Sequence, residues 1–260
     1  MSRSCSVLRV FTRDGAGGNH LGVVDELGGL DGDAMQRIAA ELGFSETVFI
    51  DYTAGPGVRI FTPTMEMPFA GHPLVGAAFH IFESGVKAER IRCGIGDVRI
   101  RREGDFVWVD APMNPDSAYR DSAGFARGAG ISDQVSTWRV EMPLDYRLVE
   151  VATAEDVAGV QPDTSSFGAA HALTVYARSG GRIRMRFFIP EAGIAEDPAT
   201  GSAAVALATR FAAAGELNGA ATIDQGEEIG HPSRIELRWE AKTASIGGTV
   251  SVDEPRELAW

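Results

Sequence analysis

The stretch Arg59-Ile-Phe-Thr-Pro63 recurs 127 residues later as Arg186-Phe-Phe-Ile-Pro190, with the arginine, one phenylalanine and the proline unchanged. In both places the pattern predicts a strand that ends at proline, followed by an irregular loop and an apolar helix. Because the offset is about half of the 260 residues, a duplicated unit explains it. We therefore predict an α+β fold of two pseudo-symmetric half-domains, each a curved, mainly antiparallel sheet around a buried central helix.

The predicted central helices lie over residues 73–84 and 200–214, and a glycine follows each of them. Both helices are apolar nearly all round, which is typical of helices buried within a domain. When the two halves of the sequence are aligned without gaps at this offset of 127 residues, the starts of the two predicted helices also match. A further helix is predicted over residues 33–42, with Asp33 as its N-cap and Gly43 as its end.

Short β-type segments bounded by Gly, Asp or Pro dominate both halves. Between them, Ala111-Pro-Met-Asn-Pro115 has the proline content of a linker. We predict an N-terminal half-domain over residues 1–114 and a C-terminal one over residues 115–260, whose last residues can pack back on the first half.

Composition limits the classes of function. The chain carries 36 acidic and 24 basic side chains, for a formal net charge of −12. A surface that negative repels nucleic acid and anionic lipid, so we expect neither nucleic acid nor membrane as a partner. No apolar run approaches the roughly 18 to 20 residues that span a bilayer, and no signal peptide is evident, so we expect a cytoplasmic protein. The two cysteines, Cys5 and Cys93, are expected to be reduced and unreactive.

Glu46 is the first candidate for catalysis. In Phe44-Ser-Glu-Thr-Val-Phe-Ile50, strand alternation places it on one face with Phe44, Val48 and Ile50. A carboxyl group among apolar side chains loses hydration, which suits it to both accept and donate a proton. A twist or bulge in the strand would instead turn the side chain to solvent.

Two loop–helix junctions supply the other candidates. In Gly71-His-Pro-Leu-Val-Gly76 and Thr200-Gly-Ser-Ala-Ala204, small residues open a buried helix whose first N–H groups can bind a carboxylate. The hydroxyl residues of the second junction can equally act as a plain N-cap. Asp197 can simply complement the helix dipole and His72 can cap its helix, so each of these residues alone leaves both interpretations open.

No sequence template for a cofactor or a metal ion is present. Walker, GxGxxG, HExxH, paired CxxC and GxSxG motifs are all absent from the expected contexts. We therefore expect neither cofactor nor metal. A hydrolytic triad of His72, Asp197 and Ser202 can be drawn, but Ser202 lacks the strand-to-helix elbow that such a nucleophile needs.

Six short motifs span nearly the whole chain. They are Phe11-Thr12, Gly17-Gly-Asn19, Phe44-Ser-Glu-Thr-Val-Phe49, Phe69-Ala-Gly-His-Pro73, Glu196-Asp-Pro-Ala-Thr-Gly-Ser-Ala203 and Gly230-His-Pro-Ser-Arg234. In this order they resemble the PhzF-like family, which is related to diaminopimelate epimerase. The stretch that begins at Glu196 is the most specific of them.

The resemblance implies a site in the cleft between two facing half-domains. In the phenazine-pathway member the substrate is an aminocyclohexadiene carboxylic acid, and a glutamate that matches Glu46 moves a proton between ring carbons. The histidine, aspartate and serine that accompany it match His72, Asp197 and Ser202. The catalytic residues implied are Glu46, His72 and Asp197, and the substrate-binding residues implied are Asn19, Gly71, Pro73, Gly201, Ser202 and Ala203.

Some positions depart from the family pattern. Epimerase relatives use two cysteines, but the matching positions here are Ala70 and Asp197, which excludes a two-thiol racemase. The resemblance does not fix the substrate, because several residues expected at or near the pocket differ from the family pattern. Some relatives also act in antibiotic pathways, on unsaturated intermediates derived from amino acids. These differing residues are His20, Gly43, Leu74 and His231.

We therefore expect an isomerase that works without a cofactor and shifts a proton or a double bond on a small unsaturated carboxylic acid. The expected context is a biosynthetic pathway, such as antibiotic biosynthesis, and a homodimer is compatible with these features. The alternatives are a hydrolase or C–C bond-cleaving enzyme on the same scaffold, or a silent ligand-binding paralogue.

Overall fold

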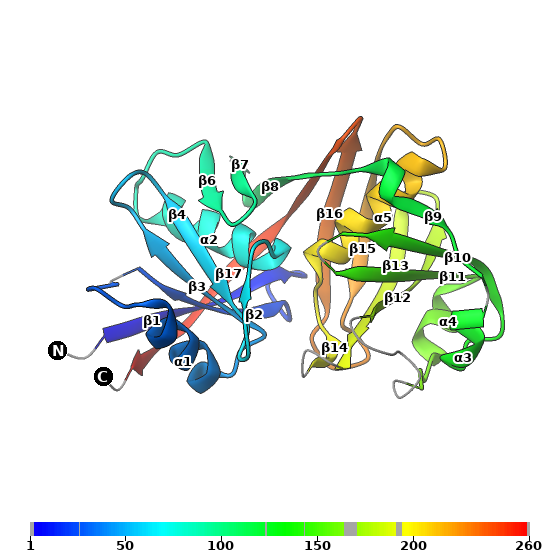
Figure 1. The fold of residues 1–260 in the computed structure, drawn as a ribbon, viewed down its shortest axis with the longest axis horizontal. Helices are drawn as coiled ribbons and strands as arrows, with labels where there is room; N and C mark the ends of the chain where they lie inside the picture. The colour runs from blue at the N-terminus through cyan, green and yellow to red at the C-terminus, as the bar shows by residue number, and fades with distance from the viewer. Residues whose placement is uncertain are drawn as a thin grey trace. The chain divides into compact units, whose positions relative to one another are not determined.

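The computed structural model describes residues 3–25, 27–122, 124–142, 144–163, 171–190 and 194–258. The chain forms two compact units, one of residues 1–110 with 247–260 and one of residues 111–246. It passes from the first unit to the second within strand β8 (Phe106–Pro112) and returns within strand β17 (Thr243–Leu258) (Figure 1).

The first unit combines a sheet with two helices, α1 (Gly32–Leu42) and α2 (Gly71–Glu83). Its sheet also contains the second part of β17. The other strands are β1 (Arg3–Thr12), β2 (Asn19–Val24), β3 (Glu46–Asp51), β4 (Gly57–Phe61), β5 (Glu66–Met67), β6 (Arg90–Cys93), β7 (Gly96–Glu103) and β8.

Strand pairing in the first unit alternates between antiparallel and parallel. The pairs β1/β2, β3/β4, β6/β7 and β7/β8 are antiparallel, whereas β2/β3 and β4/β6 are parallel. Each parallel pair needs a crossover connection, and α1 and α2 lie in these two connections. Strand β17 pairs with both β1 and β8, so the sheet curves back on itself.

The second unit contains a sheet, the short helices α3 (Gly124–Gly128) and α4 (Ala154–Gly159), the longer helix α5 (Gly201–Ala213) and a 3₁₀ turn, η1 (Pro115–Ser117). Besides the start of β17, its strands are β9 (Ala118–Arg120), β10 (Gln134–Glu141), β11 (Asp145–Val151), β12 (His171–Ser179), β13 (Arg182–Ile189), β14 (Ile194–Asp197), β15 (Asn218–Gln225) and β16 (Ser233–Glu240).

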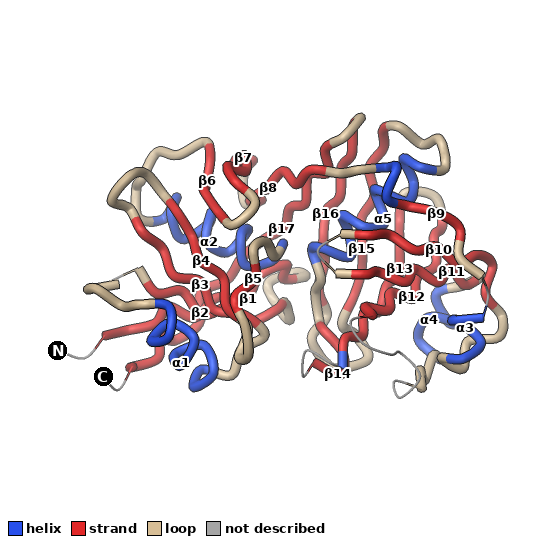
Figure 2. The backbone as a smooth tube through the Cα atoms, viewed as in Figure 1, coloured by secondary structure: helices blue, strands red, loops and turns tan. Residues whose placement is uncertain are grey.

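The pairing order of the first unit recurs in the second. The pairs β10/β11, β12/β13 and β15/β16 are antiparallel, and β11/β12 and β13/β15 are parallel, with α4 and α5 in the two crossovers. The predicted sheet-dominated α+β fold is therefore confirmed (Figure 2). Recurrence of the same mixed pairing in both units is what duplication of one ancestral unit produces.

The long apolar helix of each unit is enclosed by its own strands. Helix α2 contacts β1, β2, β3 and β7, and α5 contacts β9, β10, β11 and β16. Most residues of both helices are buried, as their composition predicted. Most polar side chains of the two helices lie near their ends, with His72 and Ser202 in the first turns.

The repeated arginine makes the same contact in both units. Arg59 donates two hydrogen bonds to Glu66, at 2.7 and 2.6 Å, and Arg186 donates two to Glu196, at 2.8 and 2.7 Å. In each unit this fork ties a longer strand, β4 or β13, to the short strand that precedes the enclosed helix, β5 or β14. The arginine recurs in the sequence because its glutamate partner recurs as well.

The helix starts are not in register at the ungapped offset. Helices α2 and α5 begin at Gly71 and Gly201, which lie 130 residues apart, three more than the offset of 127. The loop between the proline and the helix is three residues longer in the second unit. The prediction of aligned helix starts was therefore wrong by three residues, and His72 corresponds in position to Ser202.

The N-cap of α1 also differs from the expectation. Asp31, not Asp33, is the cap, and its side chain accepts a hydrogen bond from the backbone N–H of Ala34 at 2.8 Å. Gly43 ends the helix as predicted, in the left-handed conformation with φ of 66°. The acid of the first helical turn was mistaken for the cap because both positions favour aspartate.

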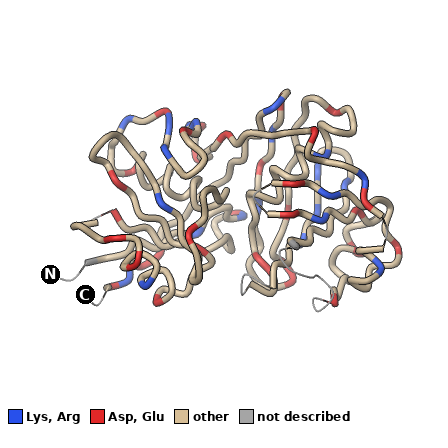
Figure 3. Tube along the Cα trace, in the orientation of Figure 1, with Lys and Arg blue, Asp and Glu red and all other residues tan. Residues whose placement is uncertain are grey.

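Acidic and basic side chains are interspersed along both units (Figure 3). Among the described residues, no helix is both long and apolar enough to cross a membrane. Cys5 and Cys93 are both buried free thiols, and burial raises the pKa of Cys5 to about 11 and also raises that of Cys93. Neither thiol is therefore disposed to react near neutral pH.

A substitution at Gly76 tests how closely α2 packs against the strands around it. A Cβ atom there would lie 2.3 Å from Cδ2 of Leu21 and 2.9 Å from Cγ2 of Val10, both buried. Gly76→Ala should lower the free energy of unfolding by about 1 to 3 kcal/mol, as measured by urea titration, because the core must shift to admit a methyl group.

Gly128→Ala is the matched control for Gly76→Ala. It adds a methyl group at the end of α3, where nothing lies within 4 Å of the new carbon. Its effect should stay below about 1 kcal/mol. If Gly76→Ala is as stable as the wild type, α2 is not packed this closely against β1 and β2.

Candidate active site

Glu46 and His72 meet in the first unit, although 26 positions separate them in the sequence. Glu46 is the first residue of β3 and His72 is the second residue of α2. Nε2 of His72 lies 3.5 Å from Oε2 of Glu46, and the two side chains are only 4% and 15% exposed. The alternative in which a strand twist turns Glu46 to solvent is therefore not what the structure shows.

Asn19 and Ser45 extend this cluster. Nδ2 of Asn19 lies 3.4 Å from Nδ1 of His72, and the Ser45 hydroxyl donates to Oδ1 of Asn19 at 2.9 Å. Asn19 is buried at the start of β2, and β2 pairs in parallel with β3 through Leu21 and Glu46. Parallel pairing of the two strand starts thus brings Asn19 and Glu46 to the same end of the sheet. We call Asn19, Ser45, Glu46 and His72 the glutamate cluster.

His72 is neutral at physiological pH. Burial lowers its pKa to about 3, which outweighs the opposite effect of a hydrogen bond with the backbone of His20. The contact between His72 and Glu46 is therefore a polar contact of an uncharged ring with a carboxyl group and not an ion pair.

The first turn of α2 places the other predicted residues of this unit. Gly71 and Pro73 flank His72 and are buried. The N-cap residue Ala70 has no side chain that can cap the helix. Proline has no N–H and is favoured early in a helix, so its position fits the observed helix start.

A second polar cluster lies at the start of α5, in the other unit. Asp197 is the last residue of β14 and is 6% exposed. Its Oδ2 accepts a hydrogen bond from the Thr200 hydroxyl at 2.5 Å, and Thr200 is the N-cap residue of α5. Gly201, Ser202 and Ala203 form the first helical turn, where Ser202 is half-buried and the other two are buried.

Gln225 completes this cluster and was missed by sequence reasoning. It is fully buried at the end of β15 and bonds to both Asp197 and Thr200. It follows Asp197 by 28 positions and belongs to no catalytic sequence template. We call Asp197, Thr200 and Gln225 the aspartate cluster. Ser45 was also missed, although it stands next to Glu46.

His20 follows Asn19 in β2 and joins two strands of the first unit. Its ring stacks on Phe44 with centroids 5.9 Å apart, and its Nε2 lies 3.4 Å from Oδ2 of Asp253. Arg9 also donates to Asp253, at 2.9 Å. His20 therefore links β2 to β17 beside the glutamate cluster.

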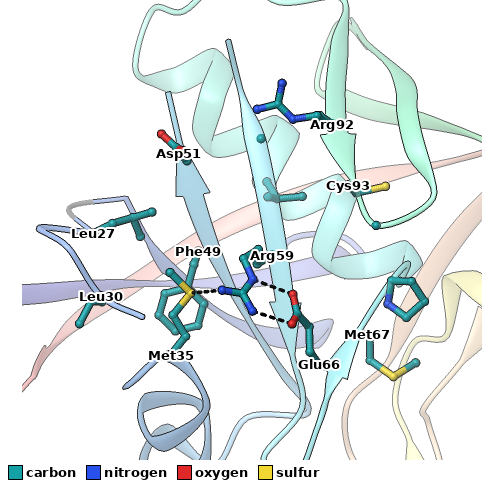
Figure 4. A pocket seen from close by; sticks show the side chains of 14 residues that line it. Leu27, Leu30, Met35, Phe49, Asp51, Arg59, Glu66, Met67, Arg92 and Cys93 are labelled. Carbon is teal, nitrogen blue, oxygen red and sulfur yellow. Dashed lines mark hydrogen bonds and ion pairs between the residues drawn. The ribbon is translucent and has the colours of Figure 1, made fainter. Parts of the chain in front are cut away.

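No group of three or more His, Cys, Asp and Glu side chains within the described part of the chain is arranged to hold a metal ion. The first unit also has a cavity of about 730 Å³, where the Arg59–Glu66 pair lies among Met35, Phe49 and Met67 (Figure 4). None of the residues predicted from the sequence to act in catalysis or substrate binding lines this cavity.

Comparisons with known proteins agree with the motifs. A model of the family described as phenazine biosynthesis-like protein matches residues 8–253. The chain is 33% identical to trans-2,3-dihydro-3-hydroxyanthranilate isomerase of Pseudomonas chlororaphis, over 88% of this chain and 87% of that protein. It is also 33% identical to an uncharacterized isomerase of Mesorhizobium japonicum, with 95% of each chain covered.

A solved structure shows the same fold. The phenazine biosynthesis protein of the PhzF family from Bacillus anthracis superimposes with a TM-score of 0.84, covering all of both chains at 20% identity. Together with the family model, these relatives show that the chain belongs to the phenazine biosynthesis-like, or PhzF-like, family. The resemblance deduced from the six motifs is thereby confirmed.

The burial of His72 predicts a specific pH dependence of stability. In the unfolded chain His72 takes up a proton below about pH 6.5, but in the folded protein it does so only near pH 3. Its contribution is therefore complete above pH 6.5 and is lost as the pH falls toward 3, by about 1.4 kcal/mol per pH unit. Urea unfolding of the wild type and His72→Gln between pH 7 and 4 measures the difference.

The wild type should lose stability more steeply than His72→Gln over this range, because all other titrating groups are common to both proteins. Equal slopes would contradict a buried neutral His72.

Proposed function

We propose that the protein is an isomerase that moves a proton, and with it a double bond, on a small unsaturated carboxylic acid. The observation that carries the proposal is the shielded carboxyl group of Glu46 beside the neutral ring of His72. The names of the relatives, several of which are isomerases, support the same reaction class.

Glu46 is the proposed proton carrier. Its carboxylate takes a proton from a carbon next to the double bond, the double bond shifts, and the resulting carboxylic acid returns the proton to another carbon. Atoms and charge balance in this step, and no redox partner or cofactor enters it. An imidazolium next to Glu46 would favour its carboxylate form, so the neutral His72 leaves Glu46 able to hold a proton in the intermediate state.

The aspartate cluster and the helix starts have binding roles in the proposal. Asp197 polarises the substrate, and Ser202 with the first backbone N–H groups of α5 binds its carboxylate. Asn19 positions the His72 ring through the 3.4 Å contact. Changes in the glutamate cluster and changes in the aspartate cluster are each expected to reduce turnover.

The substrate class of the proposal comes from the relatives. Trans-2,3-dihydro-3-hydroxyanthranilate, named in the relative from Pseudomonas chlororaphis, is the first compound to test, and dehydro amino acids with a conjugated carboxylate are the second. His20 departs from the family pattern and contacts His72 through its backbone, so both compounds are tested.

Glu46→Gln tests the proposed chemistry. It keeps the size of the side chain but cannot accept a proton, so turnover should fall by about 10²- to 10⁴-fold while substrate binding is largely retained. Turnover is followed by absorbance, and in deuterated water label should enter the product only at the carbon that receives the proton.

Glu41→Gln is the control, since Glu41 is an exposed residue of α1. It should leave turnover unchanged. A Glu46→Gln variant with near-normal turnover would overturn the role of Glu46. Wild-type protein that turns over neither compound would overturn the proposed substrate class.

A further inference from the structure

The amide of Gln225 can be oriented in only one way. Its Oε1 lies 3.0 Å from the backbone N–H of Thr200, which can only donate, and its Nε2 lies 2.7 Å from the carbonyl oxygen of Asp197, which can only accept. These two backbone groups therefore fix the oxygen and the nitrogen of the side chain. Because Gln225 is fully buried, exchange of these partners for water is not available to it.

This orientation determines the direction of the next hydrogen bond. Nε2 of Gln225 also lies 3.0 Å from the Thr200 hydroxyl, and it can only donate to that oxygen. The hydroxyl therefore keeps its own proton for Oδ2 of Asp197, at 2.5 Å. Gln225 thus donates to the Thr200 hydroxyl, and this hydroxyl donates to Asp197.

Three backbone segments pack closely around Gly226, the residue that follows Gln225. Gly226, next to Gln225, has a φ of 80°, and a Cβ atom there would lie 2.6 Å from the Pro198 carbonyl oxygen and 2.4 Å from that of His231. The end of β15 is thus held against the loop between β14 and α5. This contact sets the distance over which Gln225 can reach Asp197 and Thr200.

We propose that Gln225 and Thr200 are positioning residues that hold the Asp197 carboxylate in one orientation with Oδ2 as an acceptor. A proton that Asp197 gains is then carried by Oδ1. The proposal rests on the proposed function in one respect, namely that Asp197 acts on the substrate. Without the Thr200 hydroxyl, Oδ2 of Asp197 loses this hydrogen bond, and the carboxylate changes its orientation relative to the position that the reaction needs.

Thr200→Val tests the proposal because it removes the hydroxyl and keeps the shape of the side chain. Thr200→Ser restores the hydroxyl. Thr209→Val is the matched control, because Thr209 lies in α5, whose N-cap residue is Thr200, is 1% exposed and donates to the Val205 carbonyl at 2.8 Å. Thr200→Ala replaces Thr200→Val if the latter is not obtained as folded protein.

The first measurement is crystallographic and needs no substrate. Asp197 should keep its side-chain orientation in Thr200→Ser and Thr209→Val and change it in Thr200→Val. An unchanged Asp197 in Thr200→Val overturns the proposal, whether or not the protein is an isomerase.

The second measurement is kinetic. Thr200→Val should lower kcat by about 10- to 100-fold, whereas Thr200→Ser and Thr209→Val should stay within about threefold of the wild type. In an Asp197→Ala background, Thr200→Val should cost less than about threefold, because the hydroxyl acts through the missing carboxylate. The same loss in both backgrounds would show a general structural role and contradict the proposal. Loss of the proposed function itself would be recognised separately, as normal turnover by Glu46→Gln.

Discussion

Enclosing an apolar helix within a curved sheet is the constraint on which the rest of the molecule depends. The sides of α2 and α5 are covered by strands, and most polar side chains of both helices lie near their ends. At the start of α2 this places His72 beside Glu46, and at the start of α5 it places Thr200 beside Asp197. Burial at these two helix starts explains both the neutral ring of His72 and the need for exact hydrogen-bond partners around Asp197.

The fold was largely predictable because its signals are local and repeated. The copies at Arg59 and Arg186 indicated the duplication, and glycines marked the helix ends. The three-residue error in the helix starts arose because an ungapped comparison cannot show a loop insertion. Glu66 and Glu196 carried the missing information, since each is the bidentate partner of its repeated arginine and the two lie 130 positions apart, as the helix starts do.

The candidate site was predictable in part. Glu46, His72 and Asp197 belong to motifs that stand out in the sequence, and the structure places each of them beside polar groups, with His72 and Asp197 buried and Glu46 15% exposed. Gln225 lacks such a motif, because its role depends on β15 returning past the loop before α5. Contacts of this kind follow from chain topology, and no periodicity within one segment of sequence reports them.

The central claim is that Glu46 itself carries the proton. Infrared difference spectroscopy during a single turnover measures this directly, because a protonated carboxyl group absorbs where a carboxylate does not. A carboxylic acid band should appear and decay with turnover, shift in deuterated water, persist in Asp197→Asn and be absent in Glu46→Gln. A band that persists in Glu46→Gln and is lost in Asp197→Asn would contradict the account and assign the proton to Asp197.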